Sequence, residues 1–209
     1  GCPFEEIQPL TGVNSPITKS GTVNSAADLA TVISGIGAAK QLVSVTPTGS
    51  PNQYDVVYDI YIKNYGNTDI TNVQVRDNLS FITGSITNVS NITTSFVSNP
   101  AGLVLNGAYN GNANPNLLDG LGTLPNYPVA NSFATIRISC RLSGILNGVV
   151  YNNSAIAFAT GFNSQPLKDS STNGNNPDLN TNDKPDDAGE SQPTPLLIAI
   201  TAQTPPCDS

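Results

Sequence analysis

The feature that most constrains this chain is the alternation of apolar and polar residues between Gln53 and Asn64. Side chains on a β-strand point to opposite faces in turn, so a period of two predicts a strand with one face in a core. The residues on the apolar face are Tyr54, Val56, Tyr58, Ile60 and Ile62, whereas Asp55, Asp59 and Lys63 share the other face. The apolar face of such a strand must be covered by a second apolar surface. The sequence shows no pattern of helical period that would supply this surface.

Several other segments repeat the pattern. Residues 39–45, 70–77, 86–97, 149–160 and 194–203 are predicted as strands, and Ser132 to Leu142 is the cleanest of them, with Ala134, Ile136, Ile138, Cys140 and Leu142 on one face. Turn signals separate these runs, and no strand alternates with a helix of 10–15 residues, so a parallel α/β fold is disfavoured. The pattern predicts an all-β antiparallel β-sandwich of about 7–9 strands. Residues 106–131 are predicted as a long loop with an apolar plug at Leu117, Leu118, Leu121 and Leu124.

Composition narrows the possible functions. Only 11% of the residues are charged, the formal net charge is -7 and the isoelectric point is near 4.2, so the basic footprint that nucleic acid requires is absent. The chain contains no His, which removes the commonest general base and metal ligand. No apolar run reaches the length of a transmembrane segment. The chain contains no Met either, which indicates a mature or excised fragment.

The three cysteines are Cys2, Cys140 and Cys207. A Cys2–Cys207 disulfide would join the two ends of the chain. A link to another copy, free thiols, or a lipid-modified Cys2 after Gly1 are the alternatives. Cys140 lies on the apolar face of its strand and is predicted to be a buried core thiol.

A family resemblance rests on three motifs that occur in order. The first is the tyrosine-rich strand that continues through Asn64-Tyr65-Gly66-Asn67 into Asn72-Val73-Gln74-Val75-Arg76-Asp77-Asn78-Leu79. The second is Tyr109-Asn110-Gly111 with Asn116-Leu117-Leu118-Asp119-Gly120, and the third is Asp169-Ser170-Ser171-Thr172-Asn173-Gly174 with Pro177-Asp178-Leu179-Asn180 and Pro193-Thr194-Pro195. Over about residues 36–200 the chain resembles the tandem repeat domain of large bacterial surface proteins known as domain of unknown function eleven.

The resemblance implies an immunoglobulin-like sandwich that is repeated along stalks and adhesins on the bacterial cell surface, without catalytic residues. We expect an irregular N-terminal extension over residues 1–35, the sandwich repeat over 36–168, an acidic Asn/Asp-rich junction over 169–193, and a C-terminal strand and tail over 194–209. The extension and the terminal cysteines depart from a bare repeat, which suggests a chain end or a polymerising subunit.

The acidic junction is a candidate calcium site. Asp178, Asn180 and Asn182 alternate as in the first half of a calcium loop, and Asp183, Asp186, Asp187 and Glu190 could complete a shell of oxygen ligands. The match is imperfect, because Asp183 occupies the position where an EF-hand loop has Gly, and Gly189 the position where it has Glu. The alternative is a solvated acidic linker that needs no metal.

Three other patterns have plainer interpretations that we favour. Lys40 and Lys63 lie on strands near many Asn residues, and some Gram-positive surface sandwiches form Lys–Asn isopeptide cross-links; the plainer interpretation is ordinary surface lysines. Asp55, Asp59 and Asp77 could be paired carboxylates of a glycosidase, but an exposed sheet face explains them. Asn152-Asn153-Ser154 matches a glycosylation sequon, which an Asn-rich chain produces by chance.

We therefore expect a non-enzymatic structural or adhesive module of an extracellular bacterial surface protein or fibre. Its expected partners are neighbouring repeats or identical subunits, joined by strand addition from the first 35 residues or from Thr194–Gln203. The alternative is a module that binds surface glycans or proteins through the 106–131 loop, where Tyr109 and Tyr127 are the aromatic residues.

Overall fold

The computed structural model describes residues 32–80 and 88–199 and contains strands and one short 3-10 helix in these ranges. The strands are β2 (Ile36–Pro47), β3 (Gln53–Asn64), β4 (Ile70–Asp77), β5 (Val89–Ser98), β6 (Gly122–Leu124), β7 (Phe133–Ser143), β8 (Val150–Asn153), β9 (Ala155–Thr160), β10 (Pro166–Ser170), β11 (Thr172–Asn173) and β12 (Thr194–Leu197), and the helix η3 is Phe162–Ser164. The N-terminal extension and the Cys2–Cys207 disulfide candidate lie outside the described residues, apart from the last residues of the extension.

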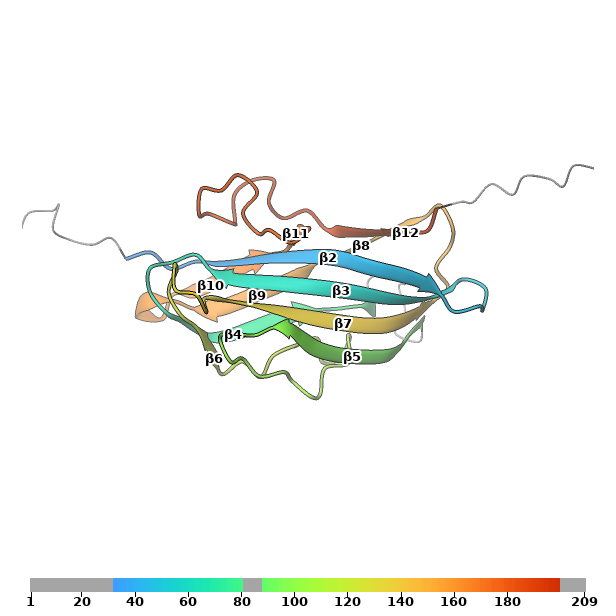
Figure 1. The fold of residues 1–209 in the computed structure, drawn as a ribbon, viewed down its shortest axis with the longest axis horizontal. Helices are drawn as coiled ribbons and strands as arrows, with labels where there is room; N and C mark the ends of the chain where they lie inside the picture. The colour runs from blue at the N-terminus through green and yellow to red at the C-terminus, as the bar shows by residue number, and fades with distance from the viewer. Residues whose placement is uncertain (1–31, 81–87, 200–209) are drawn as a thin grey trace, which may run out of the picture. The chain divides into compact units, whose positions relative to one another are not determined.

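The larger sheet has the order β11-β2-β3-β7-β5 (Figure 1). Antiparallel pairs join β2 to β3, β3 to β7 and β7 to β5, and the two-residue β11 runs parallel to β2. β3 is the central strand, and its neighbour β7 matches its period of two, whereas the first five residues of β2 are all buried. Tyr58 lies opposite Leu42 on β2 and opposite Ile138 on β7.

A second sheet has the order β10-β9-β4-β6, and β12 pairs with β8 in a separate two-stranded sheet (Figure 1). β9 presents Ala155, Ala157 and Ala159 to the interior, where short side chains leave room for the isoleucines of the larger sheet. The arrangement is an immunoglobulin-like antiparallel β-sandwich, as the sequence predicts.

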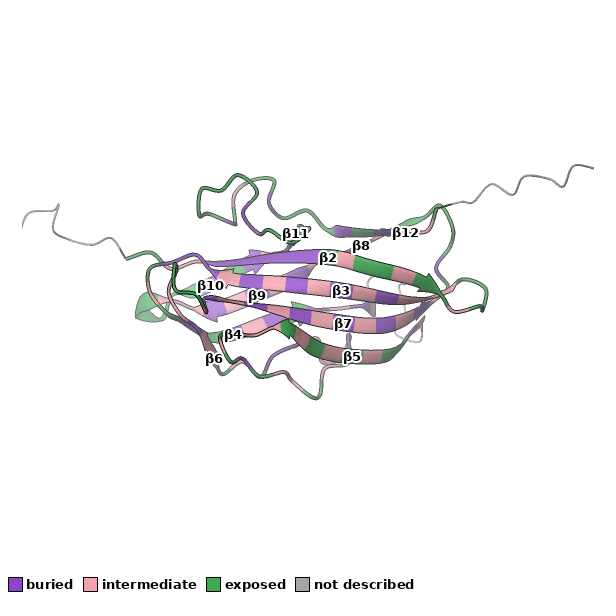
Figure 2. Cartoon of the chain, in the orientation of Figure 1, coloured by how far each residue is buried: buried purple, intermediate pink, exposed green. Residues whose placement is uncertain are grey.

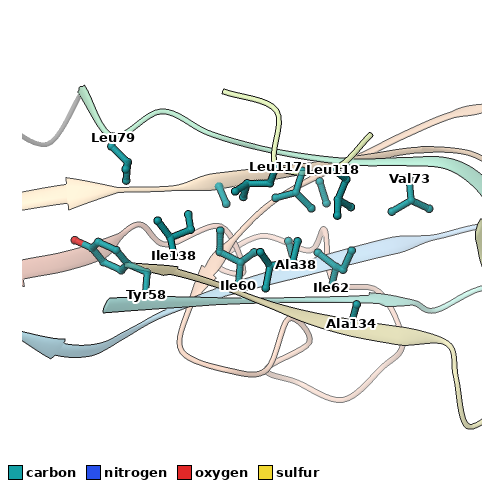
Figure 3. Packing of buried hydrophobic residues seen from close by; sticks show 14 of the residues in the cluster. Ala38, Tyr58, Ile60, Ile62, Val73, Leu79, Leu117, Leu118, Ala134 and Ile138 are labelled. Carbon is teal, nitrogen blue, oxygen red and sulfur yellow. The ribbon is translucent and has the colours of Figure 1, made fainter. Parts of the chain in front are cut away.

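The core lies between the two larger sheets (Figure 3). Figure 2 shows the alternation along β3 and β7, where buried residues are separated by partly exposed ones. The predicted inner faces are confirmed for Val56 to Ile62 on β3, for Val73 and Val75 on β4, and for Ala134 to Leu142 on β7. Cys140 is a buried core thiol, also as predicted.

The outer face of the larger sheet carries two ion pairs between directly opposed residues of β3 and β7. Arg137 binds both carboxylate oxygens of Asp59 at 2.7 Å, and Arg141 binds those of Asp55 at 2.7 and 2.8 Å. Bidentate pairs across a strand boundary fix register, but they add little to stability where water reaches them. For Asp55 and Asp59 the exposed-face interpretation is confirmed.

Three details of the prediction are corrected. The described residues contain eleven strands instead of about 7–9, because β6, β8 and β11 are two to four residues long and show no measurable period. The predicted strand over 149–160 is divided at Ser154 into β8 and β9, which join different sheets. The apolar plug holds for Leu117, Leu118 and Leu124, but Leu121 is 79% exposed in a turn beyond the core.

Candidate cross-linking site

Lys40 is completely buried, which corrects the interpretation of this residue as a surface lysine. The cause is the period of β2, because Ile36, Ala38 and Lys40 are spaced two apart and therefore face the core together. The first five residues of β2 are all buried, since the other face of this half-strand is covered as well (Figure 2). An aliphatic stem can lie in such a core, but the terminal amine needs a partner there.

The partner of Lys40 is Asp77, the last residue of β4, which is also completely buried. Val73, Val75 and Asp77 follow the same period, so the carboxylate enters the core between the sheets. Asp77 Oδ2 accepts a hydrogen bond from Lys40 Nζ. The exposed-face interpretation is therefore wrong for Asp77, although it holds for Asp55 and Asp59.

The third member of the group is Asn153, the last residue of β8. Its Nδ2 donates a hydrogen bond of 2.9 Å to Asp77 Oδ1, and the residue is 4% exposed. One carboxylate therefore contacts the amine of Lys40 through one oxygen and the amide of Asn153 through the other. No glycan could reach a residue this buried, which agrees with the interpretation of the sequon at Asn153 as a chance match.

Backbone contacts hold the group from several sides. The N–H of Asp77 donates to Pro115 O at 2.9 Å, in the loop after β5. The carbonyl oxygen of Lys40 accepts two hydrogen bonds, from Gly174 N–H at 2.9 Å and from Thr194 Oγ1 at 2.6 Å. The three side chains are thus fixed by elements that are far apart in sequence.

Aromatic and sulfur side chains surround the group. Lys40 Nζ lies 4.3 Å from the centre of the Tyr58 ring, a cation–π distance. The hydroxyls of Tyr58 and Tyr109 are buried and have no hydrogen-bond partner. Burial raises the pKa of the Cys140 thiol to about 12, so this cysteine is uncharged.

Burial also lowers the pKa of Lys40, and this effect exceeds the opposing attraction and hydrogen bond of Asp77. A lowered pKa gives access to the neutral amine, which is the nucleophilic form of lysine. The group therefore combines a nucleophilic amine, an amide carbon and a carboxylate that contacts both. These are the components of an amide exchange between two side chains.

The acidic junction forms a loop that is held by its own hydrogen bonds. Both oxygens of Asp178 accept backbone N–H groups, from Asn182 at 3.1 Å and from Asp183 at 2.8 Å. The Nδ2 groups of Asn180 and Asn182 donate to Asp187 Oδ2 at 3.4 and 2.7 Å. The structure thus brings Asp178, Asn180, Asn182 and Asp187 together.

Glu190 joins this loop from its C-terminal end. The residue is 4% exposed, and its Oε1 accepts hydrogen bonds from the backbone N–H groups of Leu179 and Asn180, whereas its Oε2 has no partner. Asp183 and Asp186 line a neighbouring hollow beside Tyr65. Within residues 32–80 and 88–199, no three acidic or cysteine side chains are arranged to hold a metal ion. Calcium binding stays a prediction.

The other predicted sites are placed as follows. Lys63 is half-buried, and its Nζ lies 4.3 Å from the ring centre of Tyr65 and 4.1 Å from that of Tyr127. Of the two tyrosines expected in a binding loop, Tyr109 packs against the core and Tyr127 is 37% exposed. In the described part of the chain, no helix is long and apolar enough to cross a membrane.

The sequence did contain a signal for two of the three core residues, Lys40 and Asp77. Lys40 has Ala38 and Leu42 two positions away on either side, and Asp77 continues the run of Val73 and Val75. Extending the alternation of each strand by one further step of two residues places Lys40 and Asp77 on apolar faces. What the sequence does not show is that the three positions meet.

Comparison with known proteins does not identify a family for this chain. No family model matches the sequence, and no curated protein matches it. The similar solved structures include BcpA, the major pilin subunit of Bacillus cereus, at 12% identity, and a variant of the same pilin at 11%. The alignments cover 66% and 67% of this chain but only 38% and 39% of the pilin, each with a TM-score of 0.36. A likeness this weak carries no argument about function.

Proposed function

We propose that this chain is a structural module that locks its own fold with an amide bond between Lys40 and Asn153. The observation that carries the proposal is the contact of a single buried carboxylate, Asp77, with both the Lys40 amine and the Asn153 amide. Because the reaction takes place once and within the chain, the module is not an enzyme for an external substrate.

The reaction balances without any other reagent. The neutral Nζ of Lys40 attacks Cγ of Asn153, and a new Nζ–Cγ bond forms. Asp77 accepts a proton from Nζ and passes it to Nδ2, since its two oxygens contact these two nitrogens. The Cγ–Nδ2 bond then breaks and ammonia leaves. No atom is oxidised or reduced, and no metal takes part.

A structural role alone explains the group poorly. Removing a lysine and an aspartate from water costs several kcal/mol per ion, and replacing a buried pair with apolar residues is often neutral or stabilising. An apolar trio would therefore fill this part of the core at least as well. A chemical use for the polar trio accounts for its presence.

The wider role that we propose is a non-enzymatic building block of an extracellular bacterial surface protein or fibre. The charge-poor, histidine-free composition and the sandwich fold support this role. Polymerisation by strand addition and contacts with identical subunits belong to the same proposal. No feature of the 106–131 loop favours glycan binding over it.

Mass spectrometry of the intact full chain tests the cross-link. The expected mass is that of the sequence minus one ammonia, and digestion should yield a branched peptide that joins Lys40 to Asn153. The Asp77→Asn variant should keep the full sequence mass, and the control Lys63→Arg, at a half-buried lysine outside this group, should lose ammonia as the wild type does. A folded wild-type chain that keeps its full sequence mass would refute the proposal.

A further inference from the structure

We infer that Thr194 is a positioning residue for the cross-link, and that docking of β12 is the condition under which Lys40 and Asn153 can react. This inference rests on the proposed function and adds a control step to it. Thr194 is the first residue of β12 and is 1% exposed. It contacts the backbone of one reactive residue and pairs with the other.

Thr194 first fixes Lys40. Its Oγ1 donates a buried hydrogen bond of 2.6 Å to the carbonyl oxygen of Lys40. The same carbonyl accepts Gly174 N–H at 2.9 Å, next to the two-residue pairing of β11 with β2. The donors that hold the Lys40 backbone therefore come from the segment that follows residue 171.

Thr194 also fixes Asn153. In the antiparallel ladder of β8 and β12, Thr194 lies opposite Asn153, and Leu197 lies opposite Val150. β8 has four residues, and in the described sheets it pairs with β12 (Figure 1). The orientation of Asn153 at the end of this short strand consequently depends on the presence of β12.

The physical consequence is a reaction with a structural precondition. Amide formation between side chains requires the amine and the amide carbon to be held in reactive geometry, and small displacements are costly in rate. Before β12 docks, Asn153 lacks its strand partner and the Lys40 carbonyl lacks one of its two donors. The covalent bond then forms last, after the sandwich is complete, and a partly folded chain is not locked in a wrong register.

The test measures the rate of cross-linking in the full chain. Chains recovered unfolded from inclusion bodies, with their full sequence mass, are diluted into refolding buffer and sampled by quenched mass spectrometry. Loss of the buried hydrogen bond in Thr194→Val should slow ammonia loss about tenfold. Thr194→Ser keeps the hydroxyl and should react at nearly the wild-type rate, as should the exposed same-strand control Leu197→Thr.

The outcomes separate the two proposals. A wild-type chain that folds without losing ammonia refutes the cross-link itself. A wild-type chain that reacts, together with a folded Thr194→Val chain that reacts within about twofold of it, overturns only the role of Thr194. Near-ultraviolet circular dichroism reports folding. If Thr194→Val does not fold, Thr194→Ser is compared with Thr194→Cys, whose thiol is a weak donor; equal rates would again overturn the inference.

Discussion

Replacing Asn153 with Leu gives the sharpest measure of what the cross-link contributes to stability. Leucine has a similar volume and cannot accept the Lys40 amine, while the Lys40–Asp77 ion pair stays in place. The variant loses the covalent bond, whereas the 2.9 Å hydrogen bond from Asn153 Nδ2 to Asp77 Oδ1 belongs to the unreacted chain, because Nδ2 leaves as ammonia. A second background measures what Asn153 contributes without the bond, and Asp77→Asn provides it because no bond should form there.

The expected size of the covalent contribution follows from loop closure. A bond between residues 40 and 153 closes a loop of about 110 residues, and restricting the unfolded chain in this way stabilises the fold by about 5 kcal/mol. Asn153→Leu should therefore cost about 5 kcal/mol in the wild type, but only about 1–2 kcal/mol, the contribution of one hydrogen bond, in the Asp77→Asn background.

Guanidinium unfolding of the four chains measures this difference. The denaturant slope should also rise when the bond is lost, since an unfolded chain without the cross-link exposes more surface. The reasoning fails if Asn153→Leu costs the same in both backgrounds. In that case Asn153 contributes a hydrogen bond and nothing more.

Three further predictions concern other parts of the fold. Burial raises the pKa of Asp169 to about 7, so the folded protein keeps a proton that the unfolded chain releases near pH 4. The free energy of unfolding should thus fall as pH rises from about 4 to about 7. Asp169→Asn keeps an acceptor for Ala38 N–H and should flatten this part of the plot of stability against pH, measured by urea denaturation. An unchanged slope in the variant would contradict the raised pKa of Asp169. Tyr58→Phe removes a buried hydroxyl without a partner and should raise the free energy of unfolding by about 1 kcal/mol, measured in denaturant; a loss of stability would show that the hydroxyl has a partner. If the acidic loop binds calcium, millimolar calcium should raise the melting temperature, and Glu190→Gln should reduce that rise. A melting temperature that is equal in calcium and in chelator would argue that the loop is a solvated acidic linker without a metal.

The long strands β2, β3, β4, β5 and β7 could be predicted because each has eight residues or more, enough to be recognised from its own sequence. β3 and β7 have twelve and eleven residues, and their burial alternates almost without interruption. The short strands could not be found in the same way. β8 and β11 exist because of tertiary pairing with β12 and β2, and two to four residues show no pattern by themselves.

From the sequence alone, Lys40 is identified as a possible cross-linking lysine but a surface lysine is favoured, and Lys40 is not connected with Asp77 or Asn153. A lysine, an aspartate and an asparagine at the ends of strand patterns are usually exposed, and each has an unremarkable interpretation when taken alone. Their meeting depends on the spatial order of strands, which places β2 in one sheet, β4 in another and β8 in a third. Sequence periodicity gives the face on which a residue lies, but not which distant residue lies across from it.

The position of the proposed bond also determines which part of the fold would bear a load. Lys40 lies near the start of the described sandwich, and Asn153 pairs with the final described strand β12. A force that pulls β2 and β12 apart would be carried by the Lys40–Asn153 bond and would bypass residues 41–152. The segment that the bond leaves unprotected runs from β9 to β12 and includes the acidic loop. That segment is held to β2 by the Asp169–Ala38, Gly174–Lys40 and Thr194–Lys40 hydrogen bonds. Resistance to pulling in a cross-linked module would therefore depend on these three contacts together with the ladders of β9 with β4 and of β12 with β8, and extension beyond them would be limited to the length of residues 154–193.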